Sequence, residues 1–276
     1  DMRLDKARAV LCLRLLLEGN SLRSTHRITG VSRNALLRLL ATVGKRAVRY
    51  WETEMRDLPA MDVECDEIWG FVGMKEKTRQ KSHYSEEFGD AYCFTAIERT
   101  SKLLLAYWLG RRTTADTANF AERLRGALTG RCQVTSDGFR PYNFLIPAAF
   151  GGQVDFAQLV KIYRSTPNST PGRYSPGEIV DLRMHNVCGY PDPSRVSTSF
   201  VERQNLNIRM GVRRMTRLTN AFSKKRENHE YHLALYFLYY NFCRVHATLK
   251  TTPAVAAGIT DKIWSVEKLL DELATH

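Results

Sequence analysis

The sequence predicts a protein of the α/β (α+β) class, with an all-α N-terminal domain followed by a larger core built on a mixed β-sheet. Three observations predict this architecture. Leucine-rich stretches with helical spacing fill the first 43 residues, runs of β-branched and aromatic residues follow from residue 61, and helical patterns return near residue 200. At 276 residues the chain has room for one large domain and one small one.

Three helices are expected in the N-terminal domain, residues 1–48. Residues 4–18 carry Ala, Val and Leu at helical spacing and contain neither Gly nor Pro. Ser21 has the side chain of a helix cap and is expected to begin a second helix that ends near residue 29. After a tight turn at Gly30, Ser32 is expected to cap the third helix.

Two short helices joined through a glycine, the second capped by serine, form the helix-turn-helix pattern. The first residues of a recognition helix face base edges, for which Asn and Arg carry matching donors. We therefore predict that Arg33, Asn34 and Arg38 contact DNA. A plain three-helix bundle with a solvated basic face is the alternative interpretation. Residues 49–60 are then expected to form a linker.

The larger domain, residues 61–250, is expected to form a mixed sheet flanked by helices. Thr114 can cap a helix before the last predicted strand, and the polar segment K-E-K-T-R-Q-K predicts a turn. The resulting order β-β-β-α-β-α suits a mixed sheet, and it is also the order of a ribonuclease-H-like domain. Short β-branched and aromatic runs predict strands at 61–72, 91–98, 103–109 and 132–136.

Two later regions depart from this plan. The stretch 151–197 is rich in Pro, Gly and Ser, so we predict an insertion made largely of loop. A long basic helix is expected to begin at Glu202, and the aromatic helix at 229–246 is expected to pack on the sheet. Residues 251–276 are expected to form a C-terminal helical tail.

Three acidic residues stand in contexts that suit metal-dependent chemistry on DNA. Asp66 lies within a predicted strand, Asp137 ends another and precedes glycine, and Glu202 opens the basic helix. A carboxylate within an apolar strand is costly unless it is paired or binds a metal. If the three converge, they can hold two Mg²⁺ ions about 3.5–4 Å apart, which activate an attacking hydroxyl and stabilise the leaving oxygen of a phosphodiester. Mn²⁺ is expected to substitute for Mg²⁺.

Each of these acids has an alternative interpretation. Glu64 lies on the same strand face as Asp66 and is its rival for the site, whereas Glu67 takes the other face. Asp137 is equally typical of a turn or a helix cap. Glu202 is equally typical of an acid in the first turn of a helix, where the helix dipole favours it.

The chain is strongly basic, with a formal net charge of +12, which favours an acidic partner such as nucleic acid. Asn205 and Arg209 follow Glu202 by three and seven residues and therefore share its helical face. We predict that these two residues, together with Arg213 and Arg214 in the basic stretch beyond, contact DNA and position its phosphates.

Several other functions have no support in the sequence. P-loop, Rossmann glycine and serine or cysteine nucleophile patterns are absent, which argues against ATPase, dehydrogenase and acyl-transfer chemistry. The six cysteines include no C-x-x-C pair, as expected of a protein from a reducing compartment. No apolar run approaches the ~18 residues of a membrane span. A cytoplasmic location without membrane contact is therefore expected.

At these residues the chain resembles bacterial insertion-sequence transposases of the InsB kind. The resemblance implies a ribonuclease-H-like core with an Asp-Asp-Glu triad, carried here by Asp66, Asp137 and Glu202, and makes Arg209 the basic residue that follows the glutamate. Two departures are a lack of zinc-binding cysteines ahead of the helix-turn-helix and a longer stretch between the second and third acids. The matching stretches are D-E-I-W-G-F-V-G-M-K, T-S-D-G-F-R-P-Y and V-E-R-Q-N-L-N-I-R, continued by R-R-M-T-R-L-T-N-A-F-S-K-K.

The expected function is DNA transposition by a nucleoid-associated protein of the bacterial cytoplasm. The N-terminal domain would bind the double-stranded ends of the element, and the core would cut DNA and join it to a target with two Mg²⁺ ions per site. A homodimer or larger assembly is expected when two ends are brought together. The alternatives are a non-catalytic helix-turn-helix regulator derived from a transposase, and a structure-specific nuclease of the same fold that cuts without joining.

Overall fold

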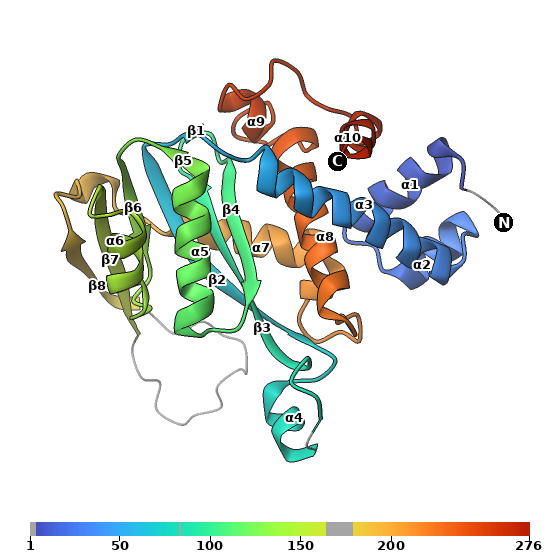
Figure 1. Ribbon diagram of the computed structural model, residues 1–276, viewed down its shortest axis with the longest axis horizontal. Coiled ribbons are helices and arrows are strands. Elements are labelled where there is room, and N and C mark those ends of the chain that lie inside the picture. The colour runs from blue at the N-terminus through green and yellow to red at the C-terminus, as the bar shows by residue number, and fades with distance from the viewer. Residues whose placement is uncertain (1–3, 83, 164–178) are drawn as a thin grey trace.

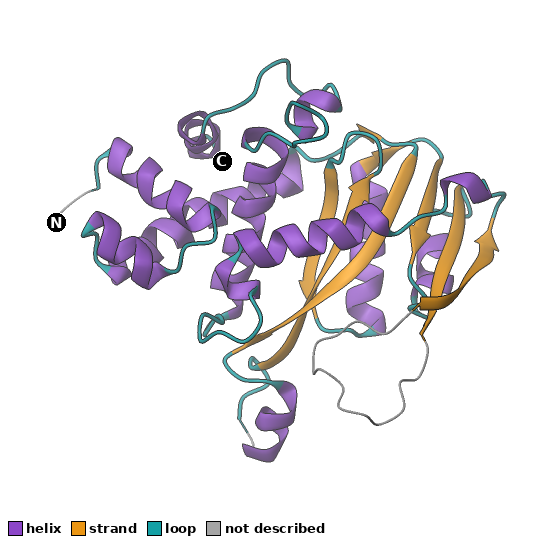
Figure 2. Cartoon of the chain, turned by 180° about the vertical axis from the view of Figure 1, so that it is seen from behind, coloured by secondary structure: helices purple, strands orange, loops and turns teal. Residues whose placement is uncertain are grey.

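A six-stranded mixed β-sheet with helices on both faces forms the centre of the protein (Figure 1). Helices α5 (Thr114–Ala127) and α6 (Tyr142–Ala149) cover one face, and α7 (Ser199–Gly211) crosses the other, as the reverse view shows (Figure 2). The predicted α/β class with a mixed sheet is therefore confirmed. The computed structural model describes residues 4–82, 84–163 and 179–276.

The sheet has the strand order β4-β3-β2-β6-β7-β8. The first three form an antiparallel meander with β2 innermost, β6 and β7 run parallel to β2, and β8 is an antiparallel edge strand. A separate parallel pair, β1 and β5, joins Leu58–Pro59 to Leu128–Thr129. The strands of the main sheet are β2 (Asp62–Val72), β3 (Gly89–Glu98), β4 (Leu104–Gly110), β6 (Cys132–Ser136), β7 (Val154–Tyr163) and β8 (Ile179–Cys188).

The second and third N-terminal helices begin at the predicted caps, and the second ends at the predicted glycine. The Ser21 hydroxyl accepts the Ser24 N–H at 3.0 Å, and the Ser32 hydroxyl accepts the Ala35 N–H at 3.2 Å. Between them Gly30 adopts φ +69°, the left-handed conformation that ends a helix and that glycine adopts without strain. The three helices are α1 (Lys6–Leu17), α2 (Leu22–Thr29) and α3 (Arg33–Thr53).

Helix α3 continues through residues 49–53, where a linker was expected to begin. Tyr50 and Trp51 are buried there, and the Trp51 indole N–H donates to the carbonyl of Ala234 at 3.1 Å. Ala234 belongs to α8 (Arg226–Leu238), whose Tyr236 and Phe237 side chains are buried as predicted. The hydrophobic core therefore continues from the N-terminal helices to the sheet.

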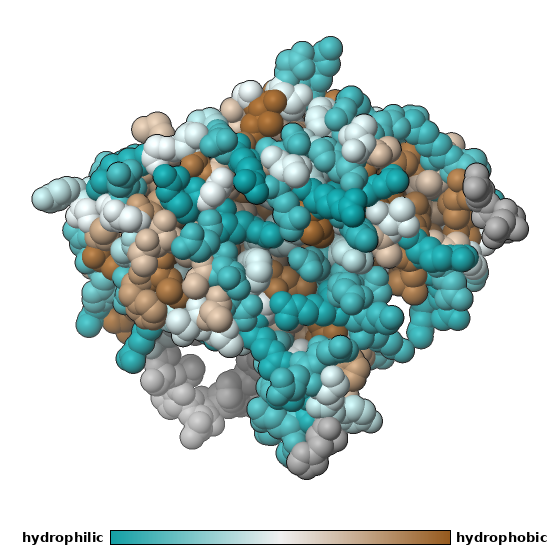
Figure 3. All heavy atoms as spheres, in the orientation of Figure 1, coloured by the Kyte–Doolittle hydropathy of each residue, from teal (hydrophilic) through white to brown (hydrophobic). Residues whose placement is uncertain are grey.

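Two expectations about local structure were wrong. The polar segment expected to be a turn contains helix α4 (Glu76–Ser82), in which Glu76 pairs with Arg79 at 2.5 Å. It projects from the end of the β2–β3 hairpin, where hydrophilic side chains cover the surface (Figure 3). Helix α5 is capped by Thr113 and not by Thr114.

The stretch 151–197, predicted to be largely loop, holds strands β7 and β8 and the short 3₁₀ helix η1 (Pro193–Arg195). Val154, Phe156 and Ala157 are fully buried because β7 lies inside the sheet between β6 and β8. An alternation of apolar and polar residues was hidden by the neighbouring Pro and Gly. Residues 164–178 of the predicted insertion lie outside the described residues.

The long basic helix predicted from Glu202 ends early, at Gly211. A Cβ atom on Gly211 would lie 2.2 Å from the Tyr236 ring, so close packing against α8 requires glycine there. The chain then turns through the 3₁₀ helix η2 (Arg213–Met215). The basic residues beyond Gly211 therefore do not form one continuous helical row.

The C-terminal segment is helical in part, with α9 (Pro253–Ala256) and α10 (Val266–Ala274) after the π-helical turn η3 (Tyr239–Cys243). Helix α10 packs beside α1 and α3, where Leu269 and Leu273 are buried. Within the described part of the chain, no helix combines the length and the apolar character that crossing a bilayer requires.

Candidate active site

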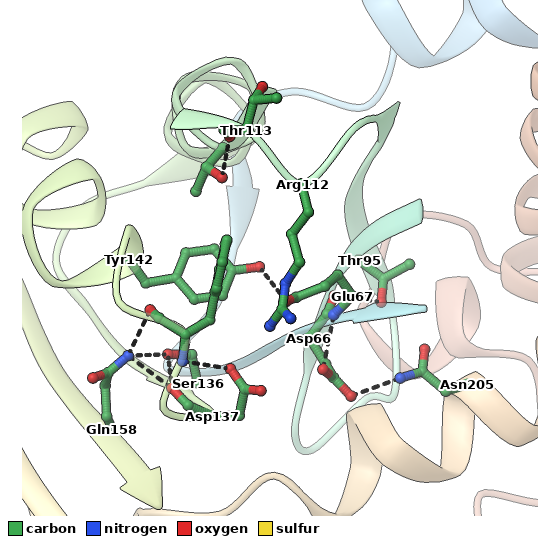
Figure 4. Close-up of polar contacts among 12 residues, drawn as sticks. Asp66, Glu67, Thr95, Arg112, Thr113, Ser136, Asp137, Tyr142, Gln158 and Asn205 are labelled. Atoms are coloured by element: carbon green, nitrogen blue, oxygen red, sulfur yellow. Dashed lines mark hydrogen bonds and ion pairs between the residues drawn. The ribbon is translucent and has the colours of Figure 1, made fainter. Parts of the chain in front are cut away.

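Asp66 and Asp137 lie side by side on two adjacent parallel strands. In the register of β2 and β6 the last pair is Cys65 with Ser136, and the two aspartates come directly after it. One carboxylate oxygen each from Asp66, Asp137 and Glu67 lies within 4.8 Å of the others. The close-up shows these acids in one small region at the end of β6 (Figure 4). The sheet therefore brings together two predicted acids that are 71 residues apart in sequence (137 − 66).

The turn that carries Asp137 is held in place by β7. The Phe139 N–H donates to the Asp137 carboxylate at 3.0 Å, and the Gln158 amide donates to the carbonyls of Asp137 and Phe139 at 2.7 and 3.1 Å. A Cβ atom on Gly138 would lie 3.1 Å from a methyl group of Val160. The glycine after Asp137 therefore allows close packing on β7.

Asp66 is oriented by helix α7. The side-chain amide of Asn205 donates to Asp66 Oδ2 at 2.7 Å, and the backbone N–H of Glu67 donates to Oδ1 at 2.8 Å. Both oxygens of this half-buried carboxylate thus accept a hydrogen bond in a fixed direction. The side chain of Asn205, for which DNA contact stays a prediction, orients a carboxylate of the site.

Glu67 joins the acidic group although strand alternation had excluded it. Its side chain is 3% exposed, pairs with the Arg112 guanidinium at 2.5 Å and accepts the Tyr142 hydroxyl at 3.2 Å. The Arg112 guanidinium also lies 4.1 Å from the centre of the Phe139 ring. Asp137 stands beyond the strand end, so its carboxylate can approach acids from either face of β2.

The crowding of these acids changes their protonation. Burial, followed by repulsion from Asp137 and Glu67, raises the pKa of Asp66 to about 7. Burial and Asp137 likewise raise the pKa of Glu67 to about 7, against the opposing effect of Arg112. Burial also raises the pKa of Asp137. A divalent cation would relieve this repulsion, and clustered carboxylate oxygens are the ligands that Mg²⁺ and Mn²⁺ prefer. The donor set therefore fits the expected metal.

Glu202 lies at the rim of the same cleft, outside the close acidic group. The cleft has a volume of about 800 Å³ and is lined by Asp66, Asp137 and Glu202 among others. The Glu202 side chain is 44% exposed, accepts the Thr198 hydroxyl at 2.8 Å and forms an ion pair with Lys161 of β7. The third predicted acid thus faces the other two and is paired with a lysine.

Glu64, the alternative to Asp66 as a site residue, contacts the start of α7. It is 2% exposed, and its Oε2 accepts the backbone N–H groups of Phe200 and Val201 at 2.8 and 3.0 Å. These belong to the first turn of α7, where helix N–H groups otherwise lack a partner. Burial raises the pKa of Glu64, and the two N–H groups oppose that shift. Glu64 therefore fixes the start of the helix that carries Glu202.

The predicted DNA contacts fall into two groups. Arg33, Asn34 and Arg38 are exposed near the start of α3, and Arg213 is partly exposed on η2. Arg209 and Arg214 are partly buried and line a hollow between β2 and η2, so their predicted contact with DNA stays a prediction. Arg209 lies in the last turn of α7, and Arg214 follows the turn after Gly211, which brings the chain back to β2.

Both of these arginines contact the protein itself. Arg209 donates to the carbonyls of Met215 and Trp69 at 2.8 and 3.2 Å, and Arg214 donates to the Ser223 hydroxyl at 2.5 Å. Burial lowers the pKa of each to about 10.

Among the charged residues that contact or adjoin the three predicted acids, Glu67, Arg112 and Lys161 were not predicted. The only sequence feature that connects Glu67 with the site is its position next to Asp66. Arg112 and Lys161 are two of 41 basic residues in the chain, and no local pattern separates them from the others. Only the folded sheet brings them to the acids.

No family model matches the chain, and no curated protein matches it. Among solved structures, the chain is similar to one described as a piggyBac transposase synaptic complex with hairpin DNA. The alignment has 12% sequence identity and a TM-score of 0.43, and it covers 99% of this chain and 70% of that one. A likeness this distant carries no functional argument, so any role for the protein has to be inferred from the geometry of its site.

Proposed function

We propose that this protein is a DNA transposase of the Asp-Asp-Glu type, with Asp66, Asp137 and Glu202 as the triad. The observation that carries the proposal is the convergence of two strand carboxylates, with oxygens within 4.8 Å, in a cleft that a helix glutamate also lines. The strand order supports a ribonuclease-H-like core, because an antiparallel meander is followed by parallel β6 and β7. The function would be cleavage and transfer of DNA strands.

Asp66 and Asp137 would hold divalent metal, with Glu67 close enough to contribute and Glu202 completing the site from the helix. When bound, Mg²⁺ supplies an activated water or hydroxyl and neutralises charge on the leaving oxygen. Asn205 keeps Asp66 in one orientation, and Gln158 keeps the Asp137 turn in place. Preorganised ligands of this kind favour phosphoryl transfer because positioning and electrostatics supply most of the catalysis.

Positive charge surrounds the acids and suits a phosphodiester substrate. Lys161 and Arg112 line the cleft beside the carboxylates, as does Arg140, which is exposed. The net charge of +12 adds a long-range attraction that salt would screen.

We further propose that residues 1–48 act as a helix-turn-helix module for the element ends. The exposure of Arg33, Asn34 and Arg38 near the start of α3 supports this role, as do the serine caps and the Gly30 turn. The segment 49–60 would connect this module to the catalytic domain at 61–250. Two such chains, or more, would assemble on paired ends.

The deciding experiment is cleavage and joining of labelled duplexes that carry the repeats flanking this gene. The reactions contain Mg²⁺, Mn²⁺ or Ca²⁺, with Asp137→Asn as the matched variant. We expect strand cleavage and transfer with Mg²⁺ or Mn²⁺ and none with the variant, which should still bind the duplex. Specific binding without cleavage would indicate a regulator. Cleavage without joining would indicate a nuclease, and joining by Asp137→Asn would overturn the triad.

A further inference from the structure

A second hollow of about 460 Å³ lies beside the acidic cleft. It is bounded by the far end of β2, the last turn of α7, η2 and the loop that returns to residue 222. Two backbone contacts hold this loop to β2, since Gly73 donates to the Ser223 carbonyl at 2.7 Å and Val72 forms a β-bridge with Ser223. The hollow is therefore formed by fixed elements. Its volume is in the range of sites that take one small ligand.

Aromatic rings form one wall of the hollow. The Trp69 and Phe71 rings are 5.8 Å apart between centroids, and Phe71 and Phe222 are 4.9 Å apart. All three side chains are partly exposed and line the hollow. A flat aromatic ligand could therefore stack there, because each ring offers a face or an edge that is not covered by the core.

The rest of the lining is cationic. Lys75 lies 5.9 Å from the centre of the Trp69 ring, and Arg217 is exposed at the mouth. Arg214 is more deeply placed, and its Nη2 has no hydrogen-bond partner among the described residues. No Asp or Glu occurs among the described residues that line the hollow. A buried donor without a partner is costly, so an anionic group is the expected complement.

The hollow and the acidic cleft are built on the same two elements. Trp69 follows Asp66 by three residues on β2, about 10 Å along the strand, with its side chain on the other face. Arg209 follows Glu202 by seven residues on α7, which also corresponds to about 10 Å. A DNA strand that runs along this edge of β2 from the acids would therefore reach the hollow within a few nucleotides.

We infer that this hollow binds an unpaired nucleotide of DNA next to the reacting phosphodiester. The inference rests on the proposed function for its location and extends that function to a second binding site. The base stacks on the wall formed by Trp69, Phe71 and Phe222, and the phosphate pairs with Arg214, Arg217 and Lys75. A base inside a duplex is already stacked and paired, so the ligand is a nucleotide displaced from the helix or at a single-stranded end.

The test compares two single-stranded probes of equal length and charge, an oligothymidylate and an abasic strand. Binding of fluorescently labelled probes is followed by anisotropy without divalent metal, so the readout does not depend on catalysis. We expect wild-type protein to bind the oligothymidylate about tenfold more tightly than the abasic strand, which corresponds to about 1.4 kcal/mol. In Trp69→Ala this preference should disappear, and Trp69→Phe should retain most of it.

Tyr190→Ala is the matched control, because this tyrosine is 92% exposed and lies away from the hollow. It should leave the preference unchanged. If Trp69→Ala fails to fold, the proposed phosphate contact is tested with Arg217→Ala. This substitution should weaken binding of both probes equally. An equal preference in wild type and Trp69→Ala would overturn the inference. Loss of Mg²⁺-dependent cleavage activity would bear on the proposed function alone, because this binding assay contains no metal.

Discussion

Asp66 and Asp137 are held by the sheet, whereas Glu202 is held by a helix that lies across it. The two aspartates follow the last paired residues of parallel strands, and hydrogen bonds from Asn205 and Phe139 fix their carboxylates. Glu202 is half exposed and is paired with Lys161. The strand acids thus form a rigid pair of high local charge. The helix acid is the proposed third ligand, and its approach to the pair depends on how α7 is placed.

The largest expected effect separates these two kinds of acid. Asp66→Asn and Asp137→Asn should each lower the Mg²⁺-dependent cleavage rate by about a thousandfold or more, because each removes a charged metal ligand. Both should also abolish the tightest Mn²⁺ binding seen by calorimetry. Glu202→Gln should lower the cleavage rate but keep one Mn²⁺ binding event, because Glu202 lies outside the close acidic group. Loss of all Mn²⁺ binding in Glu202→Gln would contradict the distinction.

The two kinds of acid could be predicted from different features of the sequence. Asp66 and Asp137 could be chosen because a carboxylate within or at the end of an apolar strand stands out, and the strands themselves follow from β-branched runs. Glu202 could be chosen from the basic helix it opens. The contribution of Glu67 could not be predicted, because it depends on Asp137 lying beyond the strand end, which only the register of β2 and β6 determines.

The basic residues were harder to place than the acids. Arg209 and Arg214 resemble one helical row in sequence, but the helix ends at Gly211 between them, and each donates to a carbonyl or hydroxyl group of the protein. Strand β7 was missed because Pro and Gly nearby favoured loop. The contacts of the two arginines join segments that are distant in sequence, and such contacts leave no signal in the local sequence.

A smaller effect is expected at Asn205, which acts on a strand acid from the helix. Asn205→Ala should lower the cleavage rate about 10- to 100-fold, the usual consequence of removing a group that orients a metal ligand. DNA binding should be unchanged, because the side chain points to Asp66. Asn207→Ala is the control on the same helix, since its side chain contacts Gln204 at 3.1 Å. Equal effects of the two substitutions would exclude a positioning role for Asn205.

Glu64 provides a test of the helix placement itself. Glu64→Ala leaves two N–H groups of α7 without their acceptor and should cost about 1–3 kcal/mol in the free energy of unfolding, measured with urea. The cleavage rate of Glu64→Ala should fall toward that of Glu202→Gln. Glu64→Gln should recover part of the lost stability and part of the lost cleavage rate. Glu227→Ala, at an exposed acid in the first turn of α8, should change neither by much. A cleavage rate unaffected by Glu64→Ala would show that α7 is placed without it.

The smallest expected effect is a pH dependence of stability that arises from the strand acids. Asp66 has a pKa of about 7 when folded, above the value of about 3.9 in an unfolded chain. Between these values the folded protein binds more protons than the unfolded chain, so the free energy of unfolding falls as pH rises from about 4 to about 7. Metal-free protein should therefore melt several degrees lower at about pH 8 than at about pH 5.5.

In Asp66→Asn the melting temperature should change less with pH. Mn²⁺ should raise the melting temperature of wild type chiefly at the higher pH, where the carboxylates are charged. An identical pH slope in wild type and Asp66→Asn would mean that the strand acids are less strained than their crowding implies.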